Sequence, residues 1–280
     1  MHLELPQIGL GTSNLGITFG DAEDDPEECI QTVTAALELG YRHIDTAQMY
    51  GNEDLVGEAI RQSAVDRDEI VLATKVHPRN LTHDDVLETT RASLDRLDTE
   101  YVDLLYVHWP IDQYDPEATL PAFDQLREEG AVKHIGVSNF TVDTLETARD
   151  VLDAPIVANQ IQLHPMLPPT EGERSEILPY AERHDIDVVA WSPLARGRAL
   201  SLSPVQAVAA KHETSPAQVI LAWLSRYDVK TVVKASSRDH LRDNLAALSR
   251  NLDAEDVERI ESVSERQRLF DREEAPWNQP

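Results

Sequence analysis

The sequence is poor in cysteine and has no long apolar run. Its 280 residues include one cysteine, Cys29, so no disulfide can form within the chain, and we expect that thiol to lie buried in a helix rather than to act as a nucleophile. No apolar run approaches the ~20 residues that a membrane-spanning helix needs. The N-terminus also lacks the basic and apolar regions of a secretory signal peptide. These absences predict a cytoplasmic protein without a membrane partner.

Positive charge is also scarce. The chain carries 51 acidic and 25 basic residues, for a formal net charge of -26. Such a surface disfavours binding to nucleic acid or to an anionic membrane. The acidic residues are spread over every predicted helix rather than collected in a tail. They therefore suggest a halophilic source, because molar salt screens charge repulsion within about 3 Å. An ordinary acidic cytosolic protein is the alternative.

Short apolar segments alternate with helical segments along the chain. The expected strands span residues 7–11, 42–46, 70–75, 102–108, 134–138, 157–163, 188–192 and 231–234. The expected helices span residues 25–40, 53–64, 82–97, 119–130, 141–152, 215–227, 239–248 and 253–263. Eight strands alternating with helices over this length predict a closed (β/α)₈ TIM barrel that forms one domain over residues 1–280. The tail, residues 267–280, is expected either to flank the barrel mouth or to be a loose end.

An open doubly wound sheet is the alternative fold. Such a sheet usually carries the glycine pattern G-x-G-x-x-G after its first strand. Here Gly9 and Gly11 are followed by Thr12, Ser13 and Asn14, so the third glycine is missing. The barrel is therefore the favoured prediction.

Polar side chains end the predicted strands, at the edge where barrel enzymes hold their active sites. Asp45 and Lys75 end the second and third strands, and Tyr50 lies in the loop between them. Strands joined by one crossover helix lie parallel, so these side chains are expected to lie together. An ammonium beside a phenol lowers the pKa of the phenol, so Lys75, held by Asp45, would make Tyr50 a proton donor. A purely structural salt bridge is the alternative.

The remaining strand ends carry groups that could hold a carbonyl compound and a planar ring. His108 could donate a hydrogen bond to a carbonyl, although a core histidine would give the same pattern. A carboxamide-bearing ring could be held by the amide, hydroxyl and indole groups of Ser138, Asn139, Gln160 and Trp191, although these residue types also serve turns and cores. Lys234 and the backbone amides after it could bind phosphate. The sequence shows no paired histidines or cysteine cluster that would indicate a metal site.

Taken together, these segments resemble the aldo-keto reductase family. The matching blocks are HIDTAQMYGNE, the strand ending in TK, LLYVHWP, GVSNF, NQIQLHP, WSPLARG and VKASS, in the order and spacing of the family. The resemblance runs from Gly9 to Asn244 and implies a monomeric, NADPH-dependent carbonyl reductase. It implies that Tyr50 is the acid in reduction and the base in oxidation, that Lys75 and Asp45 tune it, and that His108 positions the carbonyl. Direct hydride transfer of this kind implies no metal and no covalent intermediate.

The resemblance also implies the cofactor contacts. The nicotinamide would be held by Ser138, Asn139 and Gln160, with Trp191 stacking where many relatives carry tyrosine. The pyrophosphate and adenosine would lie near Ser192, Leu194, Gly197, Lys234, Ser236 and Asn244. Many relatives carry an arginine for the 2′-phosphate where this chain has His240, so NADH could serve beside NADPH. Ser13 stands where many relatives have tryptophan, which should widen the substrate pocket, and Trp109 should form a wall of that pocket.

Two other functions fit part of the pattern. A barrel lyase or aldolase would use Lys75 as a Schiff-base nucleophile, although Asp45 opposes the deprotonation that this requires. A nicotinamide-sensing subunit would bind the cofactor with little turnover, although the presence of all four central residues argues against it. The sequence does not identify the physiological carbonyl substrate.

Overall fold

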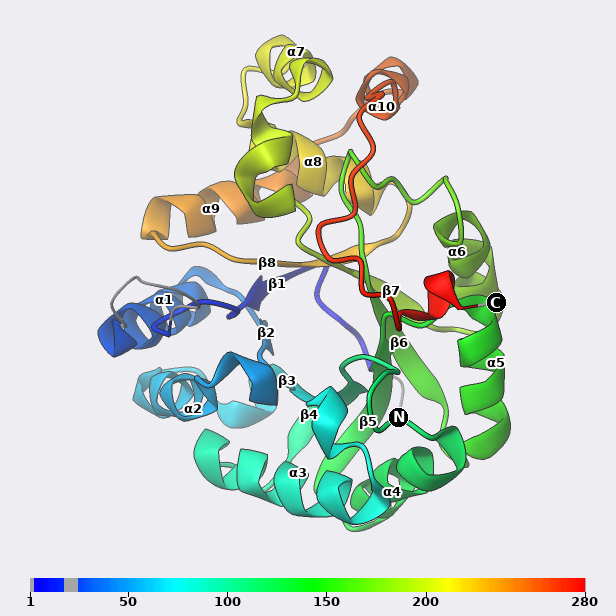
Figure 1. The fold of residues 1–280 in the computed structure, drawn as a ribbon. Helices are drawn as coiled ribbons and strands as arrows, with labels where there is room; N and C mark the ends of the chain where they lie inside the picture. Colours follow the sequence, from blue (N-terminus) through cyan, green and yellow to red (C-terminus); the bar gives the residue numbers. More distant parts are fainter. Residues whose placement is uncertain (1–2, 18–24, 280) are drawn as a thin grey trace.

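The barrel prediction is confirmed, and the open sheet is excluded. The structure is a computed structural model that describes residues 3–17 and 25–279. Each strand pairs in parallel with the next, and β1 pairs with β8 to close the barrel (Figure 1). The strands are β1 (Ile8–Gly11), β2 (His43–Asp45), β3 (Val71–Val76), β4 (Val102–Val107), β5 (Val132–Ser138), β6 (Ile156–Gln162), β7 (Asp187–Trp191) and β8 (Lys230–Val233).

Helices cover the outside of the barrel (Figure 1). In the described part of the chain they are α1 (Pro26–Leu39), α2 (Glu53–Gln62), α3 (His83–Leu97), α4 (Pro116–Glu128), α5 (Val142–Val151), α6 (Arg174–Arg183), α7 (Ser203–Lys211), α8 (Pro216–Ser225), α9 (Arg238–Ala246) and α10 (Ala254–Glu261). Helices α6 and α7 were not predicted from the sequence. Neither helix has a side chain that caps its first turn, and α6 contains Pro179, which argues against a helix when read locally.

Capping residues set most helix starts where the sequence indicated them. The Thr82 hydroxyl accepts a hydrogen bond from the Asp85 backbone, and Asp253 forms a capping box with Asp256. Two predicted starts were wrong. Helix α4 begins at Pro116 after the cap Asp115, not at residue 119, and Ser237 caps α9 in place of residue 239. In both cases a stronger signal lay a few residues upstream: a cap followed by proline for α4, and a serine cap for α9.

Two apolar layers hold the barrel together. The larger lies between the strands and the surrounding helices and includes the buried thiol of Cys29. The smaller consists of strand residues that point inward, joined by Leu3 and Leu5 from the N-terminal segment. Gly136 leaves room for the inward Tyr106 ring, because a Cβ at residue 136 would lie 2.6 Å from that ring. The barrel interior is therefore filled with side chains, which leaves its C-terminal rim as the place for a site.

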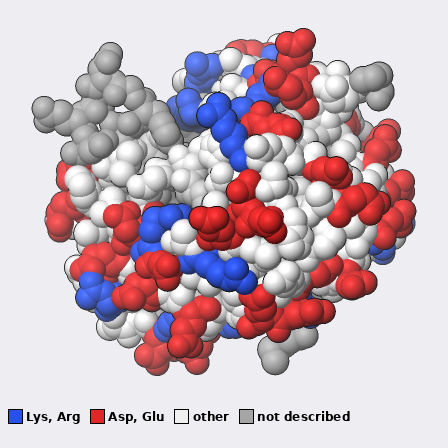
Figure 2. Space-filling view, turned by 60° about the horizontal axis from the view of Figure 1, so that its bottom comes forward, with Lys and Arg blue, Asp and Glu red and all other residues white. Residues whose placement is uncertain are grey.

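Acidic side chains cover much of the surface. Figure 2 shows them across the face it displays, with basic side chains interspersed. In the described ranges, none of the helices combines the length and the apolar character that crossing a bilayer requires.

Candidate active site

Asp45, Lys75 and Tyr50 meet at the C-terminal rim of the barrel. Asp45 pairs with Ala73 in the β2–β3 register, so Lys75 lies two residues further along β3 on the same inward face. The Lys75 Nζ donates to the Asp45 carboxylate, to the Thr46 carbonyl oxygen at 2.8 Å and to the Tyr50 hydroxyl at 3.5 Å. Lys75 is fully buried and Asp45 is 2% exposed. The structure therefore brings the three predicted side chains together.

Lys75 is held as an ammonium. Burial opposes its charge, but the attraction of Asp45 and Tyr50 outweighs burial and raises the pKa of Lys75 above its usual value. A Schiff-base nucleophile needs the neutral amine and access to the substrate. Lys75 has neither, because its ammonium donates to Asp45 and to the Thr46 carbonyl oxygen and its side chain is fully buried. The geometry therefore argues against the lyase alternative.

The net pKa shift of Tyr50 is opposite to the sequence-based expectation. Burial raises the pKa of Tyr50 above its usual 10, and the nearby ammonium of Lys75 only partly opposes this rise. The expected lowering by Lys75 is present, but desolvation of the phenolate is larger. Tyr50 is therefore a fully protonated phenol at neutral pH, which is the form that an acid in carbonyl reduction needs.

His108 faces Tyr50 across the rim as a neutral imidazole. The two rings lie 5.8 Å apart, centroid to centroid, in an edge-to-face arrangement. Burial lowers the pKa of His108 well below its usual value, and the charges of Lys75, His77 and Arg272 lower it further. A neutral imidazole has one N–H to donate. His108 can therefore donate to a carbonyl oxygen without competing with Tyr50 as a proton source.

A continuous set of hydrogen bonds joins the predicted ring-binding residues to the ion pair. The Trp191 indole N–H donates to Asn139 Oδ1 at 3.0 Å, and Asn139 Nδ2 donates to Ser138 Oγ at 3.0 Å. The Ser138 hydroxyl donates to the backbone oxygen of Gln160, whose side-chain Nε2 donates to Asp45 Oδ2 at 2.8 Å. Sequence reasoning did not predict this bond between Gln160 and Asp45. It means that Gln160 orients the carboxylate that holds Lys75.

A cavity of about 830 Å³ opens above these residues. This volume lies within the range of small-molecule sites, roughly 300–1,000 Å³. Its lining contains every predicted site residue except the buried Lys75: Ser13, Asp45, Tyr50, His108, Trp109, Ser138, Asn139, Gln160, Trp191, Ser192, Leu194, Gly197, Lys234, Ser236, His240 and Asn244.

The donors along the cavity fit a nicotinamide dinucleotide. Residues Ala195, Arg196 and Gly197 have φ angles of 49°, 55° and 88°, so the chain turns sharply in the left-handed region beside the cavity. Apart from its chain neighbours, no atom of the described residues lies within 4 Å of where a Cβ would stand at Gly197, so the backbone there can be approached closely. In the same lining, Lys234 and the N-terminal turn of α9 supply positive charge for a phosphate. The polar rim at Ser138 and Asn139 suits a carboxamide.

Sequence reasoning missed part of the lining. Arg196 stacks over Phe270 at 4.6 Å, and Phe270 packs against Trp191 with ring centroids 5.7 Å apart. Further along the same tail, Trp277 packs against Trp109 at 5.7 Å, and Arg272 lines the cavity. Near α9, the Asp243 carboxylate also lines it. The aromatic residues and arginines of the tail were the only available signal, because nothing in a local pattern shows what such a segment covers.

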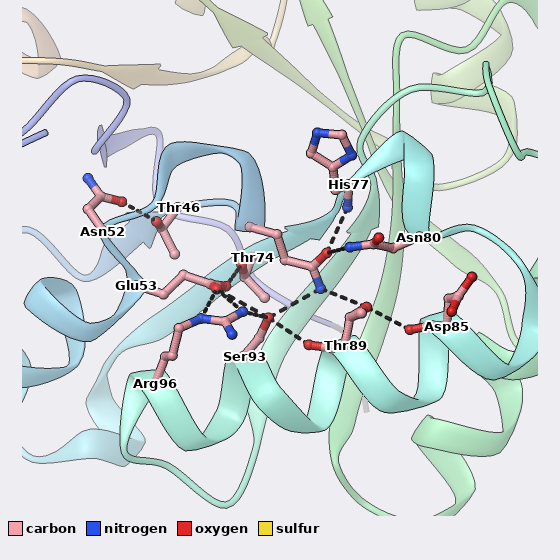
Figure 3. Close-up of polar contacts among 11 residues, drawn as sticks. Thr46, Asn52, Glu53, Thr74, His77, Asn80, Asp85, Thr89, Ser93 and Arg96 are labelled. Carbon is pink, nitrogen blue, oxygen red and sulfur yellow. Dashed lines mark hydrogen bonds and ion pairs between the residues drawn. The ribbon is translucent and has the colours of Figure 1, made fainter. Parts of the chain in front are cut away.

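A buried polar network supports the turn that carries Tyr50 (Figure 3). Glu53, 1% exposed, accepts hydrogen bonds from Thr74 of β3 and from Ser93 and Arg96 of α3. The neighbouring Gln48, two residues before Tyr50, donates to Thr89 and Ser93 and accepts from the His77 backbone at 2.9 Å and from Asn80 at 3.0 Å. These contacts tie the turn to the end of β3 and to α3.

Gln48→Leu should therefore displace Tyr50. We expect kcat to fall roughly 10-fold or more, since a 1 Å misplacement can cost about 10²-fold. The free energy of unfolding should fall by about 1–3 kcal/mol, because the His77 backbone N–H loses its acceptor. Steady-state kinetics and urea denaturation measure both. Gln62→Leu, at an exposed glutamine of α2, is the matched control. Unchanged kcat in the Gln48 variant would show that the network does not position Tyr50.

Comparison with known proteins gives one consistent result. The family model described as "Aldo/keto reductase family" matches residues 7–265. The methylglyoxal reductase DkgB of Escherichia coli O157:H7 is 38% identical over 270 residues, which cover 95% of this chain and 96% of that protein.

Solved structures agree. A crystal structure described as a candidate 2,5-diketo-D-gluconic acid reductase B superposes with a TM-score of 0.87 at 31% identity, covering 97% of this chain and 92% of that one. A mutant of Gox0644, solved in complex with NADPH, superposes with a TM-score of 0.81 at 33% identity, covering 94% of this chain and 92% of that one.

Proposed function

We propose, from the premise that this chain belongs to the aldo/keto reductase family, that Tyr50 is the proton donor in its NAD(P)H-dependent reduction of aldehydes or ketones. Reversible carbonyl reduction with a nicotinamide cofactor is the activity of the chain. The observation that carries the assignment of Tyr50 is the contact of its hydroxyl with the buried ammonium of Lys75 at the floor of the cavity. The sensing-subunit alternative predicts binding without turnover.

The proton transfer follows from the charges at the rim. In reduction, the neutral phenol of Tyr50 gives its proton to the carbonyl oxygen, and His108 donates a hydrogen bond to the same oxygen. The phenolate that remains lies beside the Lys75 ammonium, which stabilises it, while Asp45 and Gln160 keep Lys75 charged and in place. In oxidation the phenolate accepts the proton from the alcohol. When bound, the reduced nicotinamide supplies the hydride to the carbonyl carbon.

We assign the cofactor sites by the strand ends and loops that carry them. Ser138, Asn139, Gln160 and Trp191 would hold the nicotinamide, and Ser192, Leu194 and Gly197 would border the pyrophosphate. Lys234, Ser236, His240 and Asn244 would contact the adenosine end, with NADPH as the preferred cofactor. Lys234 supports this preference, since its charge lines the same cavity as Ser236, His240 and Asn244.

His240→Arg should strengthen the preference for NADPH. A guanidinium can bind a phosphate through two parallel charge-assisted hydrogen bonds, a geometry that the imidazole of His240 cannot match. We expect the ratio of kcat/KM with NADPH to that with NADH to rise roughly tenfold or more. His184→Arg, which adds the same charge at the C-terminal end of α6, is the matched control. An unchanged or lower ratio in the His240 variant would contradict the placement of His240.

Small polar carbonyl compounds are the substrates that the comparisons favour. The names of the relatives specify methylglyoxal and 2,5-diketo-D-gluconic acid. We propose substrates of similar size for this chain. Ser13 and Trp109 would border them, since both line the cavity near the rim. The described part of the tail, residues 267–279, would close one side of that pocket.

One experiment tests the function as a whole. NADPH and NADH oxidation is measured with a panel of aldehydes and ketones at low and at molar salt. We expect turnover with NADPH. Activity should be higher at molar salt, because salt screens the repulsion that a net charge of -26 causes. We also propose that the protein is a cytoplasmic monomer. Cofactor binding without turnover of any carbonyl would favour the sensing subunit instead.

A further inference from the structure

The Trp191 side chain does more than offer a flat face to the cavity. Its indole N–H donates to Asn139 Oδ1 at 3.0 Å, and this bond joins the end of β7 to the residue that follows β5. Trp191 is partly exposed, Asn139 is 2% exposed, and both line the cavity. Stacking on a planar ring requires no such bond, so the indole also acts on the amide of Asn139.

The amide of Asn139 is held on three sides. Its Nδ2 donates to the His108 carbonyl oxygen at 3.1 Å and to Ser138 Oγ at 3.0 Å, so both of its N–H groups are used. The Ser138 hydroxyl gives its own hydrogen to the Gln160 backbone oxygen at 2.8 Å, so it can accept from Asn139. With the indole N–H on Oδ1, one lone pair of that oxygen remains within the described residues. Asn139 can therefore form one further bond, and only as an acceptor.

Two of these contacts fix which end of the Asn139 amide is the oxygen. An indole N–H can only donate and a backbone carbonyl oxygen can only accept, so a flipped amide would present the wrong group to both. The Asn139 backbone is also held, since its N–H donates to the Gln160 backbone oxygen at 2.9 Å. The protein itself therefore sets the orientation of this amide, and Trp191 supplies the donor that holds its oxygen.

We propose that Trp191 is a positioning residue whose indole N–H holds Asn139 Oδ1 as the acceptor for an N–H of the nicotinamide carboxamide. The inference rests on the proposed function, in which both residues border the nicotinamide, and adds how the site selects a carboxamide on that ring. A carboxamide has N–H groups to donate, whereas a ketone in its place has none. Because the same amide donates to the His108 backbone, the ring-binding site is tied to the strand end that carries the imidazole.

The test compares NADP⁺ with 3-acetylpyridine adenine dinucleotide phosphate, in which a methyl ketone replaces the carboxamide. Isothermal titration calorimetry measures both dissociation constants. Their ratio within one protein cancels losses of stacking or of folded protein, because these affect both dinucleotides alike. In Trp191→Phe the indole is lost, and in a second protein 3-benzothienylalanine replaces Trp191, which keeps the bicyclic ring without its N–H. Asn139→Gly removes the acceptor itself and tolerates the φ of 66° at that residue.

Trp223→Phe is the matched control, and a double variant tests whether the two residues act together. Trp223 lies in α8 outside the cavity lining, and its indole N–H donates to Glu261 at 3.5 Å. Its replacement should leave the ratio of the two dissociation constants as in the wild type. The double variant combines Trp191→Phe with Asn139→Gly. If Trp191 acts on the carboxamide only through Asn139, the double variant should lose no more of the preference for NADP⁺ than Asn139→Gly alone.

We expect the wild type to bind NADP⁺ roughly tenfold more tightly than the ketone analogue, and both replacements of Trp191 to reduce this preference roughly 3- to 10-fold. The inference is overturned if the wild type shows no preference, or if both replacements keep the wild-type ratio. It is also overturned if the losses in the double variant add. Failure of the wild type to bind either dinucleotide would instead overturn the proposed function.

Discussion

Tyr50→Phe should lower kcat for carbonyl reduction by about 10²–10⁴-fold and leave NADPH binding nearly intact. In the described part of the chain, the Tyr50 hydroxyl is the only phenol hydroxyl that contacts Lys75, and the substitution removes it. The substitution keeps the aromatic ring that faces His108. No other group at the rim can take over, because Lys75 is buried and His108 is neutral with a strongly lowered pKa. Single-turnover kinetics and a fluorescence titration with NADPH separate the chemical step from binding.

Tyr114→Phe is the matched control. The Tyr114 hydroxyl is buried without a hydrogen-bond partner in the described structure, and its ring packs on Phe140, outside the cavity lining. Its removal should leave kcat unchanged. Near-full activity in the Tyr50 variant would mean that another group donates the proton, and the assignment would be wrong.

Lys75→Met should reduce both stability and activity. It leaves the Asp45 carboxylate buried without its cation, and breaking a buried ion pair in this way costs about 3–5 kcal/mol in the free energy of unfolding. It also removes the charge that stabilises the Tyr50 phenolate, and loss of one such donor lowers kcat by about 10²–10³-fold. Urea denaturation and steady-state kinetics measure the two effects.

The double variant Asp45→Asn with Lys75→Met separates stability from catalysis. Replacing both charges removes the unpaired carboxylate, so most of the lost stability should return. The side-chain amide introduced at position 45 can still accept a hydrogen bond from Gln160. Activity should stay low, because no ammonium faces Tyr50. Recovery of activity along with stability would mean that Lys75 serves the fold and not the proton transfer.

The sequence predicted the barrel and the central residues because both depend on local rules. Alternating strands and helices close into a (β/α)₈ barrel, and parallel strands joined by one helix end at the same edge. These two rules place Asp45, Lys75 and Tyr50 together without any knowledge of packing. Capping residues such as Thr82 and Asp253 act within one turn, so they too could be recognised in the sequence.

What the sequence could not show depends on contacts between distant segments. The direction of the Tyr50 pKa shift follows from how strongly the surrounding protein desolvates the phenolate, which many elements decide together. The bond between Gln160 and Asp45 joins residues 115 positions apart. The placement of Arg272 over Trp109 requires the tail to cross the barrel mouth. Local patterns set the strands and the residues at their ends. Desolvation of the Tyr50 phenolate and the covering of the cavity by the tail arise only in the folded chain, because both depend on side chains that are distant in the sequence.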